Sequence, residues 1–130
     1  MRGLRKQEDE ALAQDPSPPF AVRAGLKLAS ADPGHAAATL RLQRDGTDRA
    51  AIVDSDAISA LVQASAAAAT GGGRGDLSDI YITFVQSRPE QPLTADAHVV
   101  REEGSLHSCE VEVRDWDGAL VAKALLNYRF

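Results

Sequence analysis

Cysteine is nearly absent from this sequence. Cys109 is the one cysteine among 130 residues, so an internal disulfide is excluded. It lies in a strand pattern, where a small buried thiol is expected, and no histidine lies at a spacing that suggests a catalytic pair. The three histidines, His35, His98 and His107, have no ligand-spaced neighbours, so no metal site is predicted.

Basic runs and long apolar runs are also missing. The net charge is −5 and is spread along the chain, which disfavours binding to nucleic acid. No apolar run reaches the roughly 20 residues that span a bilayer, and residues 1–10 are charged where a signal peptide would be apolar. We therefore predict a cytoplasmic protein that does not bind membranes.

A phosphate-binding loop is not indicated either. The glycine-rich residues 71–75 follow a predicted helix, whereas a loop that cradles phosphate precedes one, so we interpret this stretch as a flexible connection. A chain of 130 residues buries roughly two thirds of its unfolded surface, and one domain can fold without metal or disulfide.

The clearest feature that is present is a helix predicted over residues 54–70. Asp54, Ser55 and Asp56 can cap its first turn, and the glycines that follow Thr70 can close its last. Larger apolar residues recur at helical spacing, and alanine fills most other positions, so no broad charged face is left. We expect this helix to be enclosed by the rest of the protein.

The remaining pattern predicts strands. Apolar and polar residues alternate, with turn residues between the runs, over residues 20–30, 36–44, 78–85, 93–101, 105–115 and 119–130. Ile80, Ile82 and Phe84 share one face of the third strand, which is expected to be well buried. A short helix and a Pro-rich connection occupy residues 1–19, ahead of a single domain over residues 20–130. The predicted class is α+β.

Three segments carry a family resemblance: residues 79–84, 92–100 and 110–122. Their order and spacing resemble those of the hotdog-fold acyl-CoA thioesterases of the phenylacetate-degradation type, from about residue 20 to the C-terminus. The resemblance implies an antiparallel sheet wrapped around one central helix. It also implies dimers whose sheets join edge to edge, with sites at the dimer interface beside the helix N-terminus.

The active-site motif of that family is altered here. The family's chemistry rests on a His-Gly-Gly run at the helix start and a carboxylate inside the helix. Asp54, Ser55 and Asp56 stand in place of the first, and Gln63 in place of the second. The Ser55 amide would still polarise a thioester carbonyl at the positive end of the helix. Gln63 can orient water, but its amide cannot take up a proton.

Some thioesterases of the superfamily use glutamine beside an aspartate and a hydroxyl residue. By analogy, Asp54 or Asp56 would be the base, and Gln63 with Ser59 or Ser55 would position the water. The alternative for both aspartates is plain N-capping, and for Gln63 it is a polar side chain satisfied at a subunit interface.

Two functions stay open at this point. The first is an acyl-CoA thioesterase in which Arg74 and Arg88 meet the phosphates of coenzyme A, although isolated surface arginines usually have no such role. Coenzyme A would enter as part of the substrate, and no separate cofactor is predicted. The second is a non-catalytic hotdog protein that binds an acyl or aromatic ligand or serves as an assembly module. An uncovered sheet edge predicts a homodimer or a dimer of dimers, a homotetramer.

Overall fold

The computed structural model describes residues 25–42, 53–72 and 74–130. The predicted N-terminal helix and Pro-rich connection lie outside these residues, as do the outer ends of the first two predicted strands. The described elements are one helix and six strands: β1 (Leu26–Asp32), β2 (His35–Leu40), α3 (Ser55–Ala69), β3 (Asp76–Phe84), β4 (Leu93–Glu103), β5 (Leu106–Arg114) and β6 (Leu120–Arg129).

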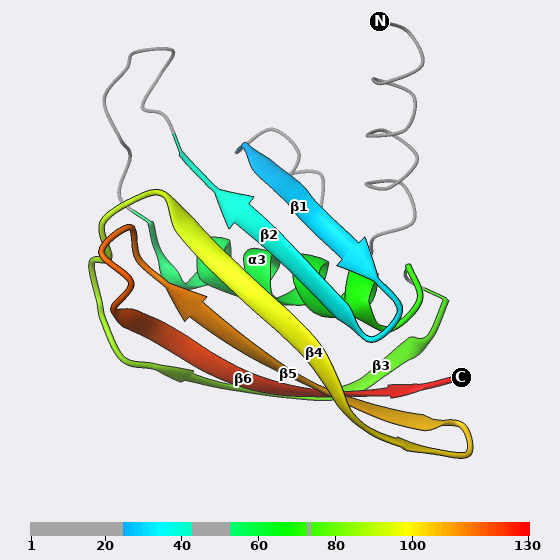
Figure 1. The fold of residues 1–130 in the computed structure, drawn as a ribbon. Coiled ribbons are helices and arrows are strands. Elements are labelled where there is room, and N and C mark those ends of the chain that lie inside the picture. The colour runs from blue at the N-terminus through cyan, green and yellow to red at the C-terminus, as the bar shows by residue number, and fades with distance from the viewer. Residues whose placement is uncertain (1–24, 43–52, 73) are drawn as a thin grey trace, which may run out of the picture.

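The six strands form one sheet in the order β1-β2-β4-β5-β6-β3, and α3 lies against one face of it (Figure 1). All neighbouring strands are antiparallel. β1 and β2 form the predicted hairpin, and β4, β5 and β6 form the predicted meander. The α+β prediction of a sheet around one central helix is therefore confirmed.

The helix begins and ends close to where its capping residues predicted. Asp54 is the N-cap, and its Oδ1 accepts a hydrogen bond of 2.9 Å from the Ala57 amide. Thr70 is the C-cap, after which Gly71 and Gly72 adopt positive φ angles of 119° and 73°. Glycine reaches these angles without a steric cost, so local sequence alone fixes the end of the helix.

Small side chains line both sides of the contact between the helix and the sheet. Ten residues of α3 are buried, most of them alanine. The core on the sheet side is also rich in alanine: Ala36, Ala38, Ala95, Ala97, Ala122 and Ala124. Such residues let the two backbones approach closely, and larger side chains such as Leu61 fill the remaining space. The prediction of an enclosed helix is confirmed.

The prediction for β3 is wrong, because this strand is not well buried. Ile80 and Ile82 are only half-buried, while Tyr81 is 65% and Phe84 45% exposed. β3 is one of the two edge strands of the described sheet and pairs with β6 alone, whereas α3 packs mainly over β2, β4 and β5. Alternation identifies a strand with an apolar face, but it does not tell where in the sheet that strand lies.

The glycine-rich stretch after α3 has a packing role that the flexible-connection interpretation missed. The ring of Phe130 lies over Gly75, where an added Cβ would come within 2.6 Å of the ring Cζ. The ring also packs against that of His107, with ring centroids 4.5 Å apart. The Phe130 amide also donates to the Ser105 carbonyl, at 2.8 Å. The end of the chain thus holds the turn that leads into β3.

The predicted alternation in β5 is confirmed. Cys109, Val111 and Val113 are buried, while Glu110 and Glu112 are partly exposed on the opposite face. Within the described segments, no helix has the length and apolar character needed to cross a membrane.

Candidate functional site

The start of α3 presents two backbone amides that no described residue hydrogen-bonds. Asp54 satisfies the next two, since its side chain accepts from Ala57 and its carbonyl accepts from Ile58 at 3.1 Å. No other described residue hydrogen-bonds to the amides of Ser55 and Asp56. The first amides of a helix have no acceptor inside the helix and carry partial positive charge. This end can therefore receive an oxygen on which negative charge develops.

A polar stripe runs along the helix from this end. Ser55, Ser59 and Gln63 are spaced by four residues and share one face. Between residues 57 and 67, Ser59 and Gln63 alone are not fully buried, and the Gln63 Nε2 donates to the Ser59 Oγ at 3.3 Å. The structure thus brings three of the predicted site residues into one row that faces away from the core.

The two aspartates differ in their surroundings. Both are exposed, and Asp54 caps the helix through one carboxylate oxygen, as its alternative interpretation proposed. Asp56 lies in the first turn, and its side chain has no hydrogen-bond or ion-pair partner among the described residues. Capping therefore accounts for the carboxylate of Asp54, whereas that of Asp56 makes no described contact and is favoured only by the positive end of the helix.

The loop that carries Arg88 lies at the same end of the molecule as the helix start (Figure 1). It connects β3 to β4. Gln86 holds this loop, since its Nε2 donates to the Asp115 Oδ2 at 3.2 Å and to the Leu120 carbonyl at 3.0 Å. Arg88 itself is exposed and has no described partner.

Arg74, by contrast, follows the other end of the helix. The 15 residues of α3 extend about 22 Å at 1.5 Å per residue, so Arg74 is far from Asp54 in its own chain. The predicted substrate-binding arginines are therefore not brought together within one chain.

Sequence reasoning missed the residues that hold the β3–β4 loop. The Trp116 Nε1 donates to the Glu90 Oε2 at 2.9 Å, and the ring stays 63% exposed. Asp115 accepts from Gln86 and also from the amides of Asp117 and Ala119. An aspartate before Asp-Gly is a recognisable turn signal, but nothing in the sequence points to its partner Gln86.

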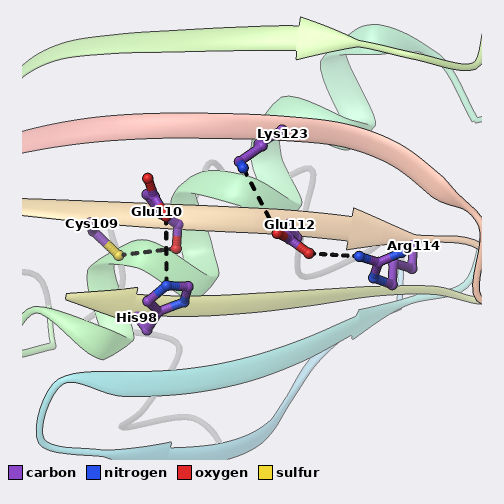
Figure 2. Close-up of polar contacts among 6 residues, drawn as sticks. All are labelled: His98, Cys109, Glu110, Glu112, Arg114 and Lys123. Atoms are coloured by element: carbon purple, nitrogen blue, oxygen red, sulfur yellow. Dashed lines mark hydrogen bonds and ion pairs between the residues drawn. The ribbon is translucent and has the colours of Figure 1, made fainter. Parts of the chain in front are cut away.

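The outer face of the sheet carries ion pairs rather than a second site. The His98 Nε2 lies 3.6 Å from the Glu110 Oε2, and Glu112 forms ion pairs with both Arg114 and Lys123 (Figure 2). Across the described ranges, no three His, Cys, Asp or Glu residues are grouped so as to hold a metal ion.

Cys109 is a buried free thiol, as the sequence predicted. Burial raises the pKa of this thiol to about 12, although a backbone hydrogen bond at His98 opposes the shift. The Sγ donates to the Glu110 carbonyl at 3.8 Å (Figure 2). The thiol is therefore protonated at neutral pH and is not a nucleophile.

Comparisons with known proteins identify the fold. No protein-family model and no curated protein sequence matches the chain. The structure is similar to AziG of S. sahachiroi, with a TM-score of 0.73 and 23% identity over 88% of this chain and 98% of that one. The PaaI protein of the E. coli phenylacetic acid degradation operon gives a TM-score of 0.75 at 19% identity, over 100% of both chains.

A hypothetical thioesterase from Streptococcus pneumoniae, solved with coenzyme A, gives a TM-score of 0.71. Its identity is 14%, over 84% of this chain and 89% of that one. At such identities the likeness concerns the fold. It confirms, at that level, the resemblance seen in the sequence: the chain has the hotdog fold, in common with the thioesterase-superfamily proteins to which it is similar.

Proposed function

We propose that this protein hydrolyses an acyl-CoA or a related thioester beside the start of α3. The observation that carries the proposal is the pair of unpartnered amides, Ser55 and Asp56, at the exposed end of an otherwise enclosed helix. When water attacks the thioester carbonyl, these amides donate to the oxygen that becomes negative. The helix end favours that charge over the neutral carbonyl, which lowers the barrier.

The chain supplies groups for the remaining steps. Gln63 and Ser59 hold the attacking water through the polar stripe, and Asp54 or Asp56 takes its proton. The tetrahedral intermediate then breaks its carbon–sulfur bond, and the leaving thiolate recovers the proton from the carboxylic acid. The products are a free acid and the thiol of the carrier. The Streptococcus pneumoniae protein solved with coenzyme A supports coenzyme A as that carrier.

We also propose that the active unit is a dimer formed through β3. The strand has no neighbour on its outer side among the described residues. Its inner face carries a strip of apolar side chains, Leu77, Ile80, Ile82 and Phe84, of which Ile80 and Ile82 are half-buried against the core and Leu77 and Phe84 are exposed. A second copy of β3 would satisfy the free backbone groups and cover this strip. Association of two such dimers would give the predicted homotetramer.

A hydrolysis screen tests the enzymatic proposal. Short-chain, medium-chain, long-chain and aromatic acyl-CoA thioesters are offered in turn, and released thiol is measured. We expect turnover of at least one class. If no class is hydrolysed while coenzyme A or an acyl analogue still binds in calorimetry, the enzymatic proposal fails.

One observation favours the alternative function. The carboxylate expected inside the helix is Gln63, and Asp54 is occupied as a cap. A non-catalytic hotdog protein would keep the helix end to bind an acyl or aromatic ligand, or would serve in assembly. Ligand binding without turnover is the result that this alternative requires.

A further inference from the structure

Within its own chain, Arg74 lies near the C-terminal end of α3, too far away to contact a ligand at the helix start. It follows α3 and precedes β3, about a helix length away from Asp54. Its guanidinium is exposed and has no hydrogen-bond or ion-pair partner among the described residues. A charge in this state is free to bind an anion.

The course of β3 connects the two ends of the molecule. The strand begins at Asp76, two residues after Arg74, and finishes at Phe84, where the loop with Arg88 begins. In Figure 1 the beginning of β3 lies near the C-terminal end of α3, and the loop after β3 lies near the N-terminal end. A strand that pairs antiparallel with β3 therefore begins near the N-terminal end of α3 and finishes near its C-terminal end.

A two-fold axis normal to the sheet produces that arrangement. It pairs two copies of β3 antiparallel and keeps both apolar strips on the same face. If the pairing is centred on Ile80, the middle residue of β3, then Phe84 lies opposite Asp76 of the partner subunit. Arg74 of the partner subunit then lies beside the loop that carries Arg88.

We infer that Arg74 acts in trans and binds the phosphates of the coenzyme A held at the other subunit's helix start. The inference rests on the proposed dimer and substrate. A guanidinium binds phosphate through two parallel hydrogen bonds, and the phosphates of coenzyme A lie many bonds from the thioester. Each site would thus have one arginine from each chain, Arg88 from its own and Arg74 from the other.

The first test measures binding of coenzyme A by titration calorimetry, which does not require turnover. We expect Arg74→Gln to weaken binding about tenfold, the scale of one charge-assisted contact, and Arg74→Lys to recover part of the loss. Arg101→Gln is the matched control, because it removes the same charge from the β4–β5 hairpin, where Arg101 pairs with Glu103 at 2.6 Å. An acylated pantetheine, which lacks the nucleotide, should bind equally to wild type and to Arg74→Gln. Equal affinity of wild type and Arg74→Gln for coenzyme A would overturn the inference.

The second test distinguishes trans from cis with mixed dimers isolated through two affinity tags. Ser59→Trp blocks the site on its own helix, and Gln63→Phe replaces it if that variant does not fold. When Ser59→Trp and Arg74→Gln are on separate chains, the trans arrangement leaves one tight site per dimer, because the unblocked helix still receives Arg74 from the blocked chain. When both changes are on one chain and the other chain is wild type, it leaves no tight site, because the unblocked helix then lacks that arginine.

A cis arrangement gives the opposite pair of results and would overturn the inference. A protein that stays monomeric would also overturn it. Failure of hydrolysis alone would not overturn the inference, because both tests measure binding. A failed enzymatic proposal and a failed role for Arg74 therefore give different results.

Discussion

At the scale of single residues, the two aspartates at the start of α3 allow a capping role to be tested separately from a catalytic one. Asp54 and Asp56 are two positions apart, but only Asp54 has its carboxylate bonded to the helix. Asparagine caps a helix about as well as aspartate, yet it cannot accept a proton. Replacement by asparagine therefore removes the base without removing the cap.

The first prediction uses this difference. We expect Asp54→Asn or Asp56→Asn to lower kcat about a hundredfold or more, as for loss of a general base, and to leave the melting temperature unchanged. Thioester turnover and thermal melts of both variants are the measurements. The variant that keeps its turnover is the control for the other, and full turnover in both would exclude either aspartate as the base.

The second prediction concerns Gln63. Since its amide bonds to Ser59 in the polar stripe, we expect Gln63→Asp to impair hydrolysis, because the amide donor is lost. Ser59→Ala should give a smaller loss in the same assay. A gain of activity in Gln63→Asp would show instead that Gln63 is a degenerate remnant of a catalytic carboxylate, which favours the binding-protein alternative.

At the scale of elements, local signals were predictable and distant pairings were not. The bounds of α3 follow from Asp54 and from the glycines after Thr70, all within the segment itself. The stripe of Ser55, Ser59 and Gln63 follows from helical spacing. The outer position of β3 depends on pairing with β6, whose sequence is about 40 residues away, so alternation in β3 alone could not reveal it.

The same reason explains the two arginines. Arg74 and Arg88 look equivalent in the sequence, but the topology places them at opposite ends of α3. The hydrogen bond from Gln86 to Asp115 joins residues 29 positions apart and has no local signal. The site could therefore be predicted where it lies on one helix, and not where several elements meet.

The third prediction belongs to the turn before β3. Gly75→Ala would place its Cβ 2.6 to 2.9 Å from three ring atoms of Phe130, so the ring must move. We expect a loss of about 1 kcal/mol in the free energy of unfolding, at the low end of overpacking, because the Phe130 ring is 45% exposed and can move toward solvent. In a Phe130→Ala background the same change should cost little, and denaturant titration of the four proteins measures this coupling. Equal costs in both backgrounds would contradict the contact.

At the scale of the whole molecule, five of the eight large apolar residues that are exposed in the described structure lie at or beside the β3 edge. Leu77, Tyr81 and Phe84 on β3, Val85 just after it and Leu125 on the neighbouring β6 are all more than a third exposed. The outer face of β4, β5 and β6 instead carries the ion pairs of Figure 2. This distribution favours assembly through the β3 edge.

The fourth prediction tests that assembly. We expect a dimer or larger species in sedimentation at micromolar concentration, and a shift toward monomer in Phe84→Lys, since lysine on an edge strand opposes pairing. Val100→Lys is a matched control, because Val100 is 47% and Phe84 45% exposed and Val100 lies on an inner strand. A monomeric wild type, or equal effects of both lysines, would count against the β3 interface.

The position of β6 between β5 and β3 also has a consequence for synthesis. β3 ends at residue 84 and its sole described partner begins at residue 120, so 36 further residues must be made before pairing can start. At about 5 to 20 residues per second, β3 leaves the ribosome several seconds before it can join the sheet. The apolar β3 edge can therefore join the described sheet only after β6 has been translated.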